Sequence, residues 1–207
     1  MPTDLDFIHQ FIPGSSDRTL LLLHGTGGDE NDLIPVGREL DPAAALLSPR
    51  GKVLENGHPR FFRRLAEGVF DLEDLKQRTN ELSDFVVAAP EHYHFNARNL
   101  VAVGYSNGAN IAASILLRRP GVLPSAILLR AMVPFIPEEV PDLSGVRVWI
   151  AGRTQDMIIP RANIERLGQM LTAAGAEVTA RFFDAGHALT NTELVQAKRW
   201  LSELTLL

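Results

Sequence analysis

The stretch Leu100–Ala112, "LVAVGYSNGANIA", places a serine between two glycines, where an apolar run gives way to a helical pattern. The residues before Ser106 are typical of a buried strand, and those after it indicate a helix. A strand that turns into a helix within so few residues strains the serine backbone, and side chains at Gly104 and Gly108 would clash there. The turn is therefore expected to lift the Ser106 hydroxyl above the edge of a sheet, where a nucleophile can act.

A serine nucleophile needs a base and a group that orients the base. The G-x-S-x-G pattern alone arises by chance in about one chain in fifteen of this length. However, Asp156 follows the apolar run "VRVWIAG" and His187 follows "ARFFDAG", in the order that α/β hydrolases use. We therefore predict a catalytic triad of Ser106, Asp156 and His187. The alternatives are Asp184 as the acid, and a serine that only turns the chain.

Short apolar runs alternate with helical patterns along the whole chain. The runs show little polar alternation, which is typical of strands covered on both faces of a parallel sheet. They are "TLLLLHG", "ALLSPRG", "NLVAVGYS", "SAILLRAM" and "RVWIAG", with "EVTARFFDAG" nearer the edge. Apolar residues recur at helical spacing within 72–86, 111–116, 164–171 and 194–201, and Thr190 with Glu193 fits a capping box. We predict one α/β-hydrolase domain over residues 1–207, with a mostly parallel, doubly wound sheet and helices on both faces.

Composition narrows the classes of function. The chain has 207 residues, a net charge of −5 and no cysteine. The charge provides no field for nucleic acid or an anionic membrane, and the lack of cysteine excludes disulfides and thiolate chemistry. The acidic N-terminus does not fit a signal peptide, and the run Leu20–Leu23 is too short to span a bilayer. We expect a cytoplasmic protein without nucleic-acid partners or membrane insertion.

The run "LLLLHGTGGDEND" offers a glycine-rich turn after a strand. It resembles the oxyanion loops of esterases, so the backbone amides of Thr26 and Asn107 are the expected oxyanion donors. A dinucleotide loop does not fit, because Glu30 stands where G-x-G-x-x-G needs its last glycine. His24 is expected to be structural. His92 and His94 lack a third ligand, so no metal site is predicted.

The segment Arg50–Asp71 fits neither strand nor helix well, and loops of this length are usually functional or mobile. We predict that it covers the active site, with phenylalanines that line a pocket or pin the cover to the sheet. The expected pocket residues are Gly25, Phe61, Tyr105, Met132 and Ile158. Four arginines, Arg60, Arg63, Arg64 and Arg130, are candidates to face an anionic part of the substrate.

The motifs "LLLHGTGGDENDL", "ENGHPRFFRR", "GYSNGANIA", "GRTQDMIIP" and "AGHALT" resemble the phospholipase/carboxylesterase family of α/β hydrolases nearly end to end. The resemblance favours its bacterial carboxylesterase branch, which is related to acyl-protein thioesterases. It implies the same triad and oxyanion donors, a small carboxylic ester as substrate, no metal or cofactor, and a homodimer. Acyl-protein thioesterases usually carry Leu where Thr26 stands, which argues against long-chain protein deacylation. An acyl thioesterase or lysophospholipase, and a non-catalytic binding module, are the alternatives.

Overall fold

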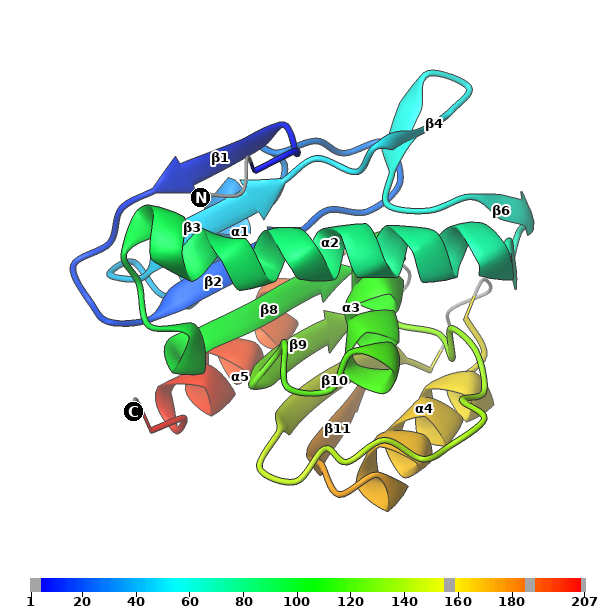
Figure 1. The fold of residues 1–207 in the computed structure, drawn as a ribbon. Helices are drawn as coiled ribbons and strands as arrows, with labels where there is room; N and C mark the ends of the chain where they lie inside the picture. Colours follow the sequence, from blue (N-terminus) through cyan, green and yellow to red (C-terminus); the bar gives the residue numbers. More distant parts are fainter. Residues whose placement is uncertain (1–4, 155–158, 185–188, 206–207) are drawn as a thin grey trace.

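A seven-stranded sheet forms the centre of the structure, a computed structural model that describes residues 5–154, 159–184 and 189–205 (Figure 1). Its strand order is β1-β3-β2-β8-β9-β10-β11. The strands are β1 (His9–Ile12), β2 (Thr19–Leu23), β3 (Ala45–Pro49), β8 (Leu100–Tyr105), β9 (Ser125–Leu129), β10 (Arg147–Arg153) and β11 (Glu177–Phe183). All neighbours pair in parallel except β1, which runs antiparallel to β3. The predicted, mostly parallel sheet is confirmed, and β1 adds an antiparallel edge strand that is not among the predicted apolar runs.

Helices cover both faces of this sheet, as the strand–helix alternation predicts. They are α1 (Ile34–Leu40), α2 (Leu72–Tyr93), α3 (Asn107–Arg118), α4 (Arg161–Ala173) and α5 (Asn191–Ser202), with a 3₁₀ turn η1 (Ala97–Asn99) before β8. In Figure 1, α2, α3 and α4 lie in front of the sheet, and α1 and α5 lie behind it. The buried apolar residues form two separate cores, and alternate residues of β2 belong to different ones. Leu21 packs in one core and Leu22 packs in the other. The doubly wound fold is therefore confirmed.

Helix α2 is longer than its apolar spacing indicates. It continues through Pro90 to Tyr93, so His92 lies in the last helical turn. His94 ends the helix in the left-handed conformation, with a φ of 58°. Its backbone N–H donates to the Pro90 carbonyl, so the last helical hydrogen bond of α2 is kept.

The segment 50–71 contains two short hairpins, so the prediction that it forms no strand is wrong. β4 (Val53–Glu55) pairs with β5 (His58–Arg60), and β6 (Arg64–Ala66) pairs with β7 (Val69–Phe70). The first hairpin turns at Asn56 and Gly57, whose φ values of 52° and 83° are both left-handed. Asn-Gly between short strands is the strongest local signal for such a turn, and the sequence contained it.

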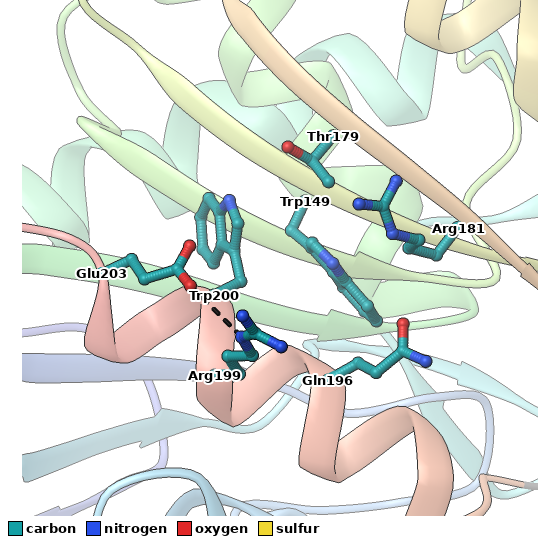
Figure 2. A pocket seen from close by; sticks show the side chains of 7 residues that line it. All are labelled: Trp149, Thr179, Arg181, Gln196, Arg199, Trp200 and Glu203. Atoms are coloured by element: carbon teal, nitrogen blue, oxygen red, sulfur yellow. Dashed lines mark hydrogen bonds and ion pairs between the residues drawn. The ribbon is translucent and has the colours of Figure 1, made fainter.

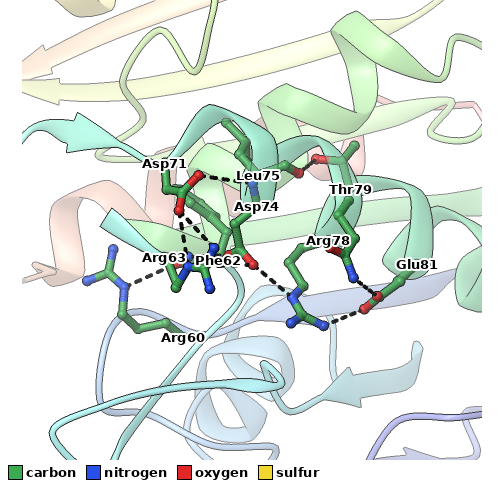
Figure 3. Close-up of polar contacts among 10 residues, drawn as sticks. Arg60, Phe62, Arg63, Asp71, Asp74, Leu75, Arg78, Thr79 and Glu81 are labelled. Carbon is green, nitrogen blue, oxygen red and sulfur yellow. Dashed lines mark hydrogen bonds and ion pairs between the residues drawn. The ribbon is translucent and has the colours of Figure 1, made fainter. Parts of the chain in front are cut away.

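The second hairpin is fastened to the start of α2 (Figure 3). Asp71 caps the helix, because its Oδ1 accepts the Asp74 N–H at 3.1 Å, and this hydrogen bond holds the pKa of Asp71 below its ordinary value. The buried Asp74 carboxylate in turn accepts the Arg63 N–H at 2.6 Å. The end of the 50–71 segment is thus held by charge-assisted hydrogen bonds.

Candidate active site

Ser106 occupies a strained corner between β8 and α3. Its φ of 51° and ψ of −111° lie outside the regions that non-glycine residues favour. The backbone is held there because the Ser106 N–H donates to the Leu129 carbonyl of β9 at 2.8 Å, and the Ser106 carbonyl accepts the Asn110 N–H at 3.0 Å. Strain of this kind persists only where the surrounding structure enforces it, and it gathers at functional sites.

The two glycines of the motif allow α3 to approach the sheet. A Cβ added to Gly104 would lie 2.6 Å from the Gly108 carbonyl oxygen. A Cβ added to Gly108 would lie 1.9 Å from the Leu23 carbonyl oxygen at the end of β2. The predicted clash therefore exists, but for Gly108 it is with a neighbouring strand rather than across the turn itself.

Two backbone amides near Ser106 are free. Within the described residues, neither the Thr26 N–H nor the Asn107 N–H donates a hydrogen bond. Thr26 follows β2 and Asn107 begins α3 after β8, and these two strands are adjacent and parallel. Asn107 is also the first residue of its helix, where an amide has no partner inside the helix. Both amides can therefore bind an anionic oxygen, and their role as oxyanion donors stays a prediction.

Residues 59–61, at the end of β5 and directly after it, hold the chain at Thr26 and at Asn107 in place. The Arg60 guanidinium donates to the Thr26 hydroxyl at 2.8 Å, and the Pro59 carbonyl accepts the Gly27 N–H at 3.0 Å. The Phe61 N–H donates to the Asn107 side-chain oxygen at 2.7 Å. This link between the 50–71 segment and the two free amides is absent from the sequence prediction, because it joins residues far apart in the chain.

The expected pocket residues differ in burial. Gly25 is buried against the Tyr105 ring, which a Cβ at Gly25 would approach to 2.9 Å. The Phe61 side chain is only 2% exposed and its ring packs on His24, with centroids 4.6 Å apart. Phe61 therefore pins the 50–71 segment to the sheet, which was the second role considered for the phenylalanines.

Met132 lies in the loop after β9, which α3 holds in place. Its N–H donates to the Asn110 side-chain oxygen at 2.7 Å. Its methyl group would lie 3.7 Å from a Cβ added to Gly68, in the turn of the second hairpin. The 50–71 segment and the loop after β9 therefore meet at Met132. Whether they cover an active site stays a prediction.

Three predicted site residues, Asp156, Ile158 and His187, lie outside the described residues. The chain on either side of them is described. Arg153 ends β10 and Phe183 ends β11, and these two residues are paired in the parallel register of the two strands. The rival acid Asp184 accepts a hydrogen bond from the Thr154 hydroxyl at 3.1 Å. The triad therefore remains a prediction, although both of its loops leave the sheet at its carboxyl edge.

His24 is held as a neutral ring. Burial lowers its pKa, which favours the uncharged form at neutral pH. Its Nε2 accepts the Gly51 N–H at 2.9 Å, so the proton lies on Nδ1, which donates to the Gly25 carbonyl at 2.7 Å. Both ring nitrogens are thereby used inside the protein, in agreement with a structural role.

Arg130 does not face a substrate, so the proposed role for it is wrong. Its side chain is fully buried, and its Nη1 lies 2.5 Å from Oε1 of Glu193, which is also fully buried. Burial opposes ionisation of Glu193, but the hydrogen bond and charge of Arg130 hold its pKa below the ordinary value. Arg60 is likewise buried, and it pairs with Glu55 at 3.0 Å.

The other arginines near the 50–71 segment are also paired. The Arg64 guanidinium donates to Glu55 at 2.9 Å, and this hydrogen bond lowers the pKa of Glu55. Arg63 is exposed and pairs with Asp71 at 2.9 Å. The positive charges of this segment therefore already have carboxylate partners.

An apolar groove of about 890 Å³ lies between the second hairpin and the loop after β9. Phe70 and Val133 contribute to its walls, and Leu117 contributes from the last turn of α3. Because a twelve-residue helix is about 18 Å long, this wall lies far along α3 from Ser106. The groove is therefore distinct from the corner that carries Ser106.

A second cavity, of about 490 Å³, lies on the other face of the sheet (Figure 2). Trp149 of β10 and Trp200 of α5 form its walls together with Arg181 of β11. Its walls include none of the residues at the Ser106 corner. The cavity is therefore separate from the edge that carries Ser106.

Two other kinds of site are absent from residues 5–154, 159–184 and 189–205. No helix among them is long and apolar enough to cross a membrane. No group of three or more acidic or histidine side chains among them is arranged to hold a metal ion.

Two of the known proteins that this chain resembles are named as hydrolytic enzymes. No protein-family model matches the chain. MhqD of Bacillus subtilis, provisionally named as a hydrolase, is 50% identical over 195 residues, which cover 94% of this chain and 98% of MhqD. The Bacillus cereus carboxylesterase is 48% identical with a TM-score of 0.91, over 94% of this chain and 92% of that one. YahD, solved with malic acid, is 34% identical with a TM-score of 0.88, over 94% of this chain and 97% of YahD.

Proposed function

The chain belongs to the carboxylesterase/phospholipase family of α/β hydrolases and is an ester hydrolase. We propose that it cleaves small carboxylic esters through an acyl-enzyme at Ser106. One observation carries the proposal. Ser106 stands in a strained corner at the carboxyl edge of the sheet, beside two backbone amides, of Thr26 and Asn107, that have no other partner among the described residues. A serine that served only to turn the chain would need neither the strain nor the amides.

The proposed reaction has two halves. The Ser106 hydroxyl attacks the ester carbonyl while His187 accepts its proton and Asp156 orients the imidazole. The carbonyl oxygen becomes anionic and is stabilised by the amides of Thr26 and Asn107. Collapse of the tetrahedral intermediate breaks the ester bond, and His187 returns the proton to the departing alcohol. Water, activated by His187, then attacks the acyl-enzyme and releases the carboxylic acid and free Ser106.

The contacts of residues 59–61 support this assignment of the amides. Stabilisation of an oxyanion is effective when the donors are fixed before the charge develops. Arg60 fixes Thr26 through its hydroxyl, and Phe61 fixes Asn107 through its side-chain oxygen. The 50–71 segment would thus contribute rigidity to the oxyanion hole in addition to covering it.

Longer acyl chains define the second candidate function, an acyl thioesterase or lysophospholipase. The groove beside Phe70 and Leu117 favours it, because its volume of about 890 Å³ and its apolar walls suit an acyl chain. The small organic acid in the related YahD structure favours a short substrate instead. The dependence of the rate on acyl length separates the two functions.

For p-nitrophenyl esters, we expect kcat/KM to rise over the first few acyl carbons and then to fall for long chains. Each buried methylene contributes about 0.8 kcal/mol, or roughly fourfold in binding. A long chain that reaches the turn at Gly68, which lies against Met132, must displace the second hairpin. Initial rates from acetyl to palmitoyl esters measure this profile. A steady rise to palmitoyl would favour the longer-chain function.

Activity on a neutral ester should decrease as the pH falls through about 6 to 7, because only a neutral His187 can accept the serine proton. Asp156 should raise this apparent pKa somewhat, because it favours the imidazolium. The dependence of kcat/KM for p-nitrophenyl acetate between pH 5 and 8 measures it. A rate that stays constant over this range contradicts the assignment of His187.

In the measurement of the pH dependence, unfolding of the protein must be separated from protonation of the catalytic base. Burial lowers the pKa of His24 in the folded state, so the unfolded chain binds the additional proton more readily. The contribution of His24 to stability is therefore complete above about pH 6.5 and is lost as the pH falls below it. Circular dichroism at each pH should accompany the rates, and only points with fully folded protein should be fitted.

A further inference from the structure

A cluster of three fully buried charges lies beneath the carboxyl edge of the sheet. The Glu193 carboxylate pairs with Arg130 through Oε1, at 2.5 Å, and with Arg153 through Oε2. Two guanidinium groups share one carboxylate, and Nε and Nη2 of Arg130 have no hydrogen-bond partner among the described residues. Buried charges and unsatisfied donors are costly, and apolar side chains of similar volume are often as stable or more so. Stability alone therefore does not account for the cluster.

The cluster connects the segments that lead to the proposed catalytic residues. Arg130 directly follows Leu129, whose carbonyl accepts the Ser106 N–H at 2.8 Å, and its φ of 63° turns its side chain out of the strand path. Its own N–H donates to the Ala151 carbonyl of β10 at 3.1 Å. The nucleophile corner is therefore attached to the cluster through β9.

The other two members stand beside the loops of the acid and the base. Arg153 is the last residue of β10, three positions before Asp156 in the sequence. Glu193 lies in the first turn of α5 and accepts the Thr190 N–H at 3.0 Å, and Thr190 stands three positions after His187. One carboxylate thus joins the chain after β9, the end of β10 and the start of α5.

We propose that Glu193 is a positioning residue for ester hydrolysis, which with Arg130 and Arg153 fixes the Ser106 corner relative to the end of β10 and the start of α5, the described residues that flank Asp156 and His187. This inference rests on the proposed function. Proton transfer between a serine and a histidine depends steeply on geometry, and a displacement of about 1 Å can reduce the rate about 100-fold. The cluster would therefore act on kcat, since it touches neither the substrate nor the reacting atoms.

The decisive variant replaces all three charges together, as Arg130→Met, Glu193→Leu and Arg153→Met. Such replacements of buried ion clusters are often tolerated or stabilising, so this protein should retain its melting temperature. We expect kcat on p-nitrophenyl acetate to fall at least tenfold, with KM within about twofold of the wild-type value. The rate of fluorophosphonate labelling at Ser106 should fall in parallel, because it uses the same base.

Glu193→Gln provides a second test that does not depend on the folding of the triple variant. It retains the shape and an acceptor for Thr190, and we again expect a lower kcat at nearly constant KM. Asp41→Asn is the matched control, since it breaks the Arg18–Asp41 ion pair (2.8 Å) beside the amino end of β2. It should lower the melting temperature without changing kcat.

The proposal is overturned if either folded cluster variant keeps kcat within threefold of the wild type, or if Asp41→Asn lowers kcat as much as Glu193→Gln does. Failure of the proposed function would give different results. Wild-type protein would then not hydrolyse the esters, or a Ser106 variant would still do so.

Discussion

Ser106→Ala is expected to abolish ester hydrolysis and to leave the fold intact, with kcat/KM lower by about 10⁴ to 10⁶. The substitution removes one hydroxyl from a half-buried side chain. It keeps the backbone hydrogen bond to the Leu129 carbonyl, and alanine meets the same backbone strain that serine already bears. Rates with p-nitrophenyl acetate, together with a thermal melt, measure both parts of this expectation.

Ser114→Ala is a suitable control for this experiment. Ser114 lies on the same helix α3, is fully buried and forms a hydrogen bond of 2.7 Å with Thr79. Its loss should lower stability but leave turnover unchanged, so it separates damage to the helix from damage to the chemistry. A fluorophosphonate probe should label wild type and Ser114→Ala but not Ser106→Ala. Activity of Ser106→Ala within tenfold of wild type would rule out Ser106 as the nucleophile.

The fold was predictable because it depends on local patterns that the chain repeats. Runs such as 20–23 and 126–129 are apolar throughout, and a short run of this kind is typical of a strand buried on both faces. The corner at Ser106 was predictable for a related reason. Its two glycines and the change from strand to helix pattern lie within a few residues of one another, so no distant contact is needed to interpret them.

The contacts between distant segments were not predictable. Nothing near Arg130 in the sequence indicates that its partner is Glu193, which the sequence presents only as part of a capping box. Likewise, Arg60 looks like surface charge until the first hairpin folds back and places its guanidinium on the Thr26 hydroxyl. In both cases the partner is chosen by the packing of separate elements, which a single sequence does not display.

The short hairpins were not predicted for another reason. Their strands have two or three residues, too few for an alternating pattern, and they pair only with each other among the described residues. The Asn56–Gly57 pair was the available signal for a hairpin. To use it, these turn residues have to be given more weight than the lack of a strand pattern on either side. Pro90 inside α2 shows that a residue that usually ends helices is tolerated near the end of a well-packed one.

Gly108→Ala is expected to cost about 4 kcal/mol or more of folding stability, a large part of the 5 to 15 kcal/mol that is usual for a domain. The new Cβ would lie 1.9 Å from the Leu23 carbonyl oxygen and 2.6 Å from that of His24. Both obstacles are backbone, which cannot rotate away as a side chain can, so α3 would have to move away from the sheet. Urea-induced unfolding followed by circular dichroism measures the loss.

Gly168→Ala is the matched control, because Gly168 also lies inside a helix, α4. A Cβ there would meet only Ile150 and Val178 side-chain atoms at 3.8 Å, which is ordinary contact. It should therefore raise stability by about 0.5 to 1 kcal/mol, the usual gain of alanine over glycine within a helix. If Gly108→Ala also stays within about 1 kcal/mol of wild type, then close packing of α3 on β2 is not what requires glycine at this position. If it folds only weakly, its remaining folded fraction should also be a poor esterase, since moving α3 moves the Asn107 amide away from the oxygen that it is proposed to bind.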